Sequence, residues 1–308
     1  MFSKLRDKIY QKITEPKIVK LTATIALIVV TVSITIGIIV AVIGPPGGYN
    51  PIDNYISDLG GSPFTPFPYF LDIAAIISGI FLIPTLIYLG KILIDIPKNN
   101  EDRDKISHLK KIYGIYWIIW ILVVLVIFLL IGIIFNTNPL IFEGNPRVIQ
   151  LTLNDPALIF YYTIFPIILW LAGLLMLFIP IPRFNEVSRM RIRLGLVGFA
   201  WSIVGLVGWF FIGVFSEDRN ILFLHFWAGI LCFIGFPLAG FFYGLIIIFY
   251  DTIFPKALGI YTTFVPTIAC FILIYTFEPL AEWSLLFSIF GWLIPGYMLL
   301  IRHFKTLD

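Results

Sequence analysis

Charged residues are scarce in this chain: Asp, Glu, Lys and Arg make up 13% of its 308 residues, against about 25% in soluble domains. Because 59% of the residues are hydrophobic, the composition excludes an ordinary soluble domain, and we expect no nucleic-acid partner. Cysteine is also rare. Cys232 and Cys270 both lie inside apolar runs, which excludes an external disulfide framework.

Apolar residues form runs that are too long for the core helices of a soluble protein. A bilayer core about 30 Å thick needs roughly 20 apolar residues in helical conformation. Eight segments meet or approach that length: Leu21–Gly44, Pro68–Leu93, Ile112–Phe135, Ala157–Ile181, Leu194–Phe215, Ile221–Tyr250, Ala257–Thr276 and Trp283–Ile301. The first run is too long for a cleaved signal peptide, and we expect it to be retained. The pattern predicts an all-α fold, a polytopic membrane helical bundle with eight transmembrane helices.

Basic residues are divided unequally between the two sides of this bundle. Of 21 Lys and Arg residues, 19 fall on the side of the amino terminus, and only Arg147 and Arg219 fall opposite. The positive-inside rule then places both termini in the cytoplasm and the protein in the cell membrane. Tyr and Trp at the ends of the segments are expected in interfacial belts: Tyr49, Tyr69, Tyr250 and Trp283.

The chain divides into three parts by charge and hydrophobicity. Residues 1–20 alternate basic and apolar side chains, which predicts an amphipathic arm that lies against anionic inner-leaflet headgroups. All connections between the predicted spans are short, so residues 21–302 are expected to form a single transmembrane domain. Residues 303–308 form a short cytoplasmic tail.

Carboxylates gather on the outer side with few basic residues. This side holds nine acids: Asp53, Asp58, Asp72, Glu143, Asp155, Glu217, Asp218, Glu278 and Glu282. Considered by charge alone, these acids are better explained by solvated loops than by a binding site. Asp72 is different, because it lies about one turn inside its predicted span, and intramembrane ionisable groups are functional candidates.

His225 is the only histidine predicted on the outer side, about one turn inside the sixth span. It shares a helix face with Gly229, Cys232 and Phe236, where small residues leave room beside the imidazole. A structural histidine that donates to a carboxylate across a helix interface is the simpler interpretation. The short spacing nevertheless predicts that Glu217, Asp218 and His225 lie near one another.

Two motifs in the outer loops resemble a known family. Tyr55-Ile56-Ser57-Asp58-Leu59-Gly60 with Asp72 and Gly79, and Gly213-Val214-Phe215-Ser216-Glu217-Asp218 with His225 and Glu282-Trp283, resemble the membrane family catalogued as domain of unknown function 998. Its members are polytopic proteins of archaea and bacteria with no established activity, and position 72 is expected to be Asn there. Ser-Asp-Leu-Gly before a helix is also remotely similar to the Frag/DRAM/Sfk group, which includes a factor in lipid remodelling of glycosylphosphatidylinositol anchors.

Three functions remain open from these residues. The first is an outward-facing site for a lipid headgroup or small amphipathic ligand, lined by Ser57, Asp58, Asp72, Glu217, Asp218, His225 and Glu282. Such a set could bind a divalent cation, or it could use His225 and Asp58 in catalysis. The second is ion or solute transport, favoured by proline-containing spans and an acidic vestibule but opposed by an uncharged bilayer midplane. The third is a non-catalytic scaffold or sensor.

Overall fold

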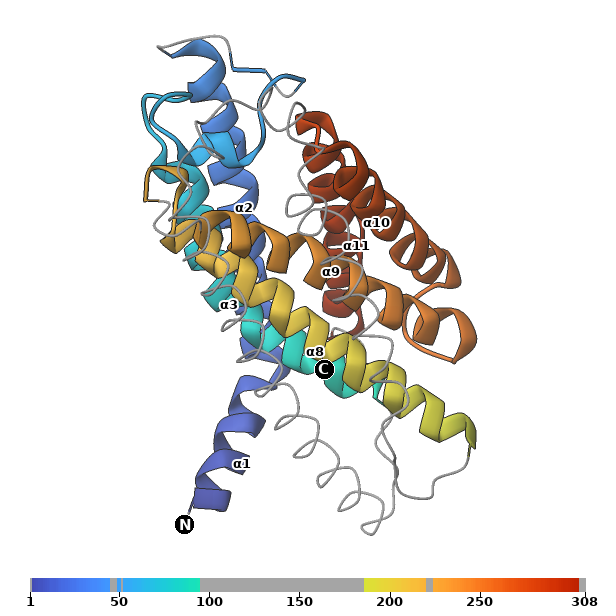
Figure 1. Cartoon of the computed structure of the whole chain (residues 1–308). Helices are drawn as coiled ribbons and strands as arrows, with labels where there is room; N and C mark the ends of the chain where they lie inside the picture. Colours follow the sequence, from blue (N-terminus) through green and yellow to red (C-terminus); the bar gives the residue numbers. More distant parts are fainter. Residues whose placement is uncertain (1, 45–48, 51, 95–185, 220–223, 305–308) are drawn as a thin grey trace, which may run out of the picture.

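The computed structural model describes residues 2–44, 49–50, 52–94, 186–219 and 224–304. Within these ranges the fold is helical and contains no strand. Six helices are long and apolar enough to cross a membrane. They are α2 (Pro16–Ile43), α3 (Tyr69–Leu93), α8 (Glu186–Val214), α9 (Leu224–Phe249), α10 (Lys256–Thr276) and α11 (Pro279–Phe304), shown in Figure 1. This is the architecture of a multi-pass membrane protein.

Five of the six helices match a predicted span to within five residues at each end, whereas α8 begins at Glu186, eight residues before the predicted Leu194. The main differences lie at amino-terminal ends, where α2 begins at Pro16 and α11 at Pro279. Proline is favoured in the first turn because its missing N–H would have no partner there. Five residues assigned to the arm therefore belong to α2. The predicted spans Ile112–Phe135 and Ala157–Ile181 lie outside the described residues, so the predicted count of eight is not tested.

Glycine sets the closest helix contacts. A Cβ added to Gly235 of α9 would lie 2.3 Å from the Gly205 nitrogen of α8, and one added to Gly208 would lie 2.3 Å from the Cys232 nitrogen. Where α9 meets α10, a Cβ on Gly244 would lie 2.2 Å from Thr263 Oγ1. Small residues of this kind are how helices approach closely in lipid, where no hydrophobic force drives them together.

Polar contacts show which helix ends lie together. At one end, Arg191 Nε of α8 donates to the Leu93 carbonyl of α3 at 2.9 Å, and Tyr297 of α11 donates to the Lys20 carbonyl of α2 at 3.0 Å. This end holds the start of α2 and the end of α11, and we call it the basic end. The segment from Tyr49 to Pro68 lies at the opposite end, which we call the loop end.

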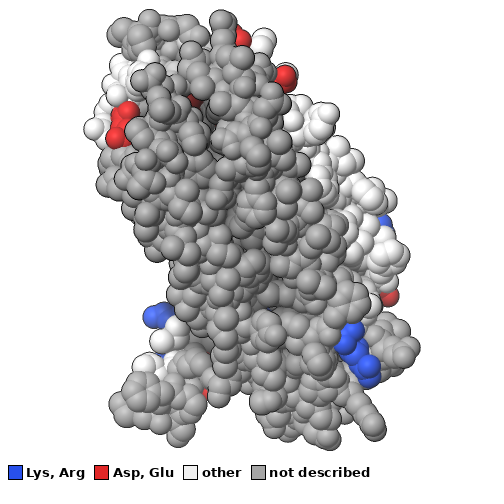
Figure 2. Space-filling model, viewed as in Figure 1, with Lys and Arg blue, Asp and Glu red and all other residues white. Residues whose placement is uncertain are grey.

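The short helix α1 (Phe2–Ile13) extends away from the bundle at the basic end (Figure 1). Leu5, Ile9 and Tyr10 are exposed on it. In Figure 2, most visible acidic atoms lie toward the upper end of the view and the largest basic patches toward the lower end.

Candidate functional site

The loop between α2 and α3 folds around Asp58. The Tyr55 backbone N–H donates to Asp58 Oδ2 at 2.9 Å, and Asn54 Nδ2 donates to the same oxygen at 3.4 Å. These bonds precede a 3₁₀ turn, η1 (Ser57–Gly60), in which Asp58 is only 6% exposed. Asp and Asn favour such turns because their short side chains bond nearby backbone N–H groups.

The start of α11 holds one side of this loop. Glu282 Oε2 accepts the Ile56 N–H at 3.0 Å and also bonds the Ser57 backbone. The neighbouring Trp283 donates its indole N–H to the Asn54 carbonyl at 3.0 Å. Both side chains are buried, so the α10–α11 hairpin is fastened to the loop by side-chain bonds to its backbone.

The α8–α9 connection holds the other side of the loop through the 3₁₀ turn η5 (Glu217–Arg219). Glu217 shares a hydrogen bond with Asp58. Asp218 accepts from Ser62 twice, from the backbone N–H at 3.0 Å and from the hydroxyl at 3.1 Å. A Cβ at Gly61 would lie 3.2 Å from Glu217 Oε2, so glycine lets the loop approach this carboxyl group.

Asp72 lies beneath the same turn. It is 4% exposed in the first turn of α3, and a Cβ at Gly60 would lie 3.4 Å from its Oδ1 and 3.9 Å from the Glu217 nitrogen. The Gly213 backbone of α8 also packs against the Asp72 carbonyl. The structure thus gathers Ser57, Asp58, Asp72, Glu217, Asp218 and Glu282 around one loop; we call Asp58, Glu217 and Glu282 the carboxyl cluster.

His225 is positioned differently from the carboxyl cluster. Its Nδ1 lies 2.6 Å from the Phe215 carbonyl, and the imidazole also bonds the Ile212 backbone. These are carbonyls of the last turn of α8, which lack partners within their own helix. The buried imidazole therefore caps α8 and ties it to the first turn of α9 through backbone carbonyls, whereas the simpler interpretation expected a carboxylate as its partner.

Burial raises the pKa of both Asp58 and Glu217, and the charge of Asp58 raises the pKa of Glu217 further. Burial raises the pKa of Asp58 to about 6. Burial, the Asp58 charge and its hydrogen bond raise the pKa of Glu217 to about 8. Because two adjacent carboxylates do not both ionise readily, Asp58 and Glu217 share one proton near neutral pH.

Among the described residues, few basic residues lie at the same end of the bundle as this cluster. Over the ranges that the structure describes, Arg219 is the only Lys or Arg at the loop end of the bundle. Within the same ranges, no group of three His, Cys, Asp or Glu side chains is placed to hold a metal ion. A divalent cation, which the sequence allowed as one possibility, therefore gains no support from the described residues.

Two aromatic residues of this network were not recognised from the sequence. Tyr49 and Trp283 were expected in interfacial belts, but they are only 4% and 3% exposed. Tyr49 donates its hydroxyl to the Tyr55 carbonyl at 2.8 Å, and Tyr55 donates to the Phe277 carbonyl at 2.5 Å. A tyrosine or tryptophan near a span end has the same sequence signature whether it contacts headgroups or closes a loop.

Comparison with protein-family models, with curated proteins and with solved structures finds no match for this chain. The resemblance to the family named above therefore remains a prediction from two short motifs. The proposal of a function therefore rests on the fold and on the carboxyl cluster.

Proposed function

We propose that this is an eight-span protein of the cell membrane, with both termini in the cytoplasm, that binds the headgroup of an amphipathic lipid at the loop end. The topology is supported by the contact between Arg191 and Leu93. These residues flank the segment 95–185, so the chain leaves and re-enters the described bundle at the same end. An even number of crossings, such as the two predicted from the sequence, fits that arrangement.

The observation that carries the ligand proposal is the charge imbalance of the carboxyl cluster. Three acids from separate parts of the chain meet in a largely buried place, and Glu217 Oε2 has no hydrogen-bond partner among the described residues. A buried acceptor without a partner costs free energy comparable to a lost hydrogen bond. A headgroup that donates hydrogen bonds, above all a primary amine, would satisfy this oxygen and neutralise the cluster.

The apolar middle of the spans, next to the carboxyl cluster, favours an amphipathic ligand over an ion. Over their central turns the six described spans carry no Asp, Glu, Lys or Arg; the basic residues Lys20, Arg191 and Arg193 lie in the turns of α2 and α8 nearest the basic end. Hydrated ions are opposed by such a lining, whereas acyl chains suit it. A ligand with a polar head and an apolar tail would match both the carboxyl cluster and the apolar middle of the spans.

The test compares bound lipid in matched variants of the full chain. Native mass spectrometry of the purified protein, titrated with phosphatidylethanolamine or with phosphatidylcholine, whose quaternary ammonium donates no hydrogen bond, should show preferential binding of the primary amine headgroup. Asp58→Asn and Glu282→Gln should abolish that preference. Glu278→Gln, which changes an exposed acid at the same end, should retain it.

Melting temperature and monodispersity establish that each variant is folded. Unchanged headgroup preference in folded Asp58→Asn and Glu282→Gln protein would refute the proposal. Cation flux through sealed proteoliposomes, lost in these two variants but kept in Glu278→Gln, would decide for transport instead.

A further inference from the structure

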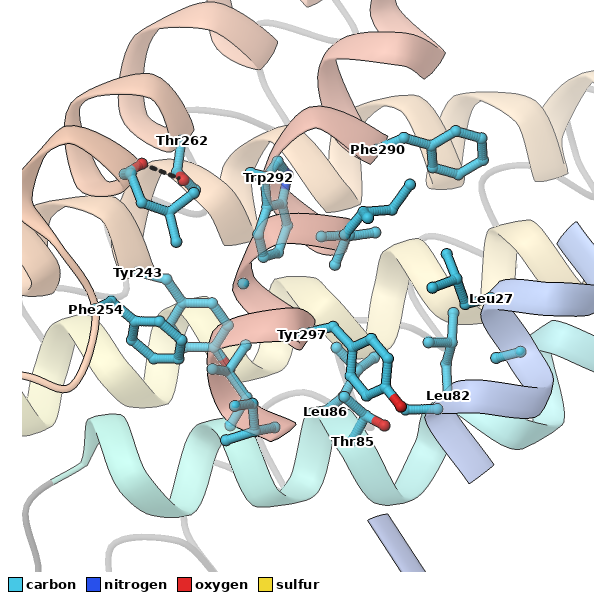
Figure 3. A pocket seen from close by; sticks show the side chains of 18 of the residues that line it. Leu27, Leu82, Thr85, Leu86, Tyr243, Phe254, Thr262, Phe290, Trp292 and Tyr297 are labelled. Atoms are coloured by element: carbon cyan, nitrogen blue, oxygen red, sulfur yellow. Dashed lines mark hydrogen bonds between the residues drawn. The ribbon is translucent and has the colours of Figure 1, made fainter. Parts of the chain in front are cut away.

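The bundle contains a second feature, an apolar cavity near its basic end. Its volume is about 90 Å³, and it lies between α2, α3, α9, α10 and α11. Figure 3 shows Tyr243, Trp292 and Tyr297 gathered between these helices, with Leu27, Leu82 and Leu86 nearby. Along the helices, the lining extends from Val30 near the middle of α2 to Leu93 and Leu300 close to the ends of α3 and α11. The cavity therefore occupies the half of the bilayer opposite the carboxyl cluster.

The chemistry of the lining favours a hydrocarbon ligand over a hydrated one. The cavity surface is almost entirely apolar, and two of its hydroxyl groups are engaged elsewhere. Thr262 donates to the Leu258 carbonyl at 2.6 Å, and Tyr297 donates to the Lys20 carbonyl at 3.0 Å. Cavities of this kind stay dry and accept hydrocarbon.

The surroundings of the cavity at the basic end are positively charged. Exposed Lys20 supplies the carbonyl that Tyr297 bonds. Arg191 bonds the carbonyl of Leu93, a lining residue, and exposed Arg302 follows the lining residue Leu300 by two positions. Basic residues at this depth attract anionic headgroups.

The helix α1 places further charge and apolar surface at the same end. Exposed Lys8 and Lys12 alternate on it with exposed Leu5 and Ile9. A helix of this composition lies in the plane of an anionic membrane surface. An anionic headgroup above an apolar cavity is therefore the combination that this end of the bundle matches.

We propose that the cavity binds a segment of one acyl chain of an anionic phospholipid from the leaflet at the basic end, with its phosphate against Lys20 and Arg302. The proposal does not depend on the carboxyl cluster, because the two sites lie at opposite ends of the spans. Asp58→Asn should accordingly leave it unchanged.

Trp292 provides the signal for a test, since it lines the cavity and brominated acyl chains quench nearby tryptophan. The full chain is reconstituted in phosphatidylcholine vesicles that contain, at equal mole fraction, brominated phosphatidylglycerol or brominated phosphatidylcholine. We expect stronger quenching by phosphatidylglycerol. Trp292→Phe should remove that excess, and Lys20→Gln should weaken the preference by about fivefold, as expected from about 1 kcal/mol per basic residue.

Two variants fill the cavity, and one controls for added bulk. Ala26→Phe introduces a ring at a buried lining position. Gly296→Leu is the milder alternative, because a Cβ there would meet only Leu258 Cδ2, at 3.9 Å. Ile28→Phe adds bulk on the exposed face of α2. The stronger quenching by phosphatidylglycerol should be lost in either variant with a filled cavity and kept in Ile28→Phe.

The proposal is overturned if both brominated lipids quench equally in the unmodified protein. It is also overturned if the stronger quenching by phosphatidylglycerol survives in a folded variant with a filled cavity, because the acyl chain would then lie outside the cavity. A melting temperature close to that of the unmodified protein identifies the folded variants. Should Ala26→Phe fail this criterion, Gly296→Leu decides the question.

Discussion

Replacing Glu217 by Gln should stabilise the protein at neutral and alkaline pH. The Gln amide can donate to Asp58 as a protonated Glu does, but it needs no proton to do so. In the unfolded chain Glu217 ionises near pH 4.5, whereas in the folded protein burial and Asp58 raise its pKa to about 8. The folded state holds the extra proton between these values, so its stability falls as the pH rises through this range.

The structure gives the size of this effect. Each tenfold change in proton affinity corresponds to about 1.4 kcal/mol. A pKa raised from 4.5 to about 8 then sets an upper bound of about 5 kcal/mol on the loss. Since Glu217 is partly accessible and shares its proton with Asp58, we expect about 2 kcal/mol, or roughly 4–8 °C in melting temperature.

The assay is thermal unfolding of purified protein in detergent at a series of pH values from about 5 to about 9. The melting temperature of the unmodified protein should fall across this range. Glu217→Gln should fall by less than half as much, while Glu278→Gln, an exposed acid at the same end, should follow the unmodified protein. A melting temperature that rises with pH, or equal slopes for Glu217→Gln and the unmodified protein, would refute the inferred proton sharing.

Two further predictions concern packing and topology. Gly235→Ala should cost about 1–3 kcal/mol by overpacking, because its Cβ would lie 2.3 Å from Gly205 N, whereas Gly229→Ala meets nothing within 4 Å and should be neutral or stabilising in a thermal melt. In intact cells an impermeant thiol reagent should label Glu278→Cys and leave Gln11→Cys unlabelled. The opposite pattern would invert the proposed orientation.

The described helices were predictable from the sequence because bilayer thickness fixes the length of an apolar span. Most predicted and observed ends therefore differ by only a few residues, as in Ala257–Thr276 against Lys256–Thr276, although α8 begins eight residues before the predicted Leu194. The gathering of Ser57-Asp58 and Glu217-Asp218 was also predictable, since loops on one side of a bundle can converge. Their contact through η1 and η5 agrees with that expectation.

The individual bonds of the site were not predictable, because they depend on side-chain direction at span ends. His225 was considered as a base oriented by Glu217 or Asp218, but Glu217 bonds Asp58, Asp218 bonds Ser62, and His225 caps α8. Helical spacing gave its distance along the chain from the acids but not the direction of the ring. Phe277 shows the same limit: its left-handed conformation, with φ 50°, ends α10 at a residue that carries no turn signal.

The two proposed sites have separate physical requirements. At the loop end, acids that share a proton need a donor or a positive charge, whereas at the basic end an apolar cavity beside Lys20 and Arg302 needs hydrocarbon and an anion. One lipid cannot satisfy both, because the cavity and the carboxyl cluster lie in opposite halves of the spans and require headgroups of opposite charge. Independent loss of amine-lipid binding in Glu282→Gln and of anionic-lipid quenching in Gly296→Leu is therefore the pattern that this charge distribution requires.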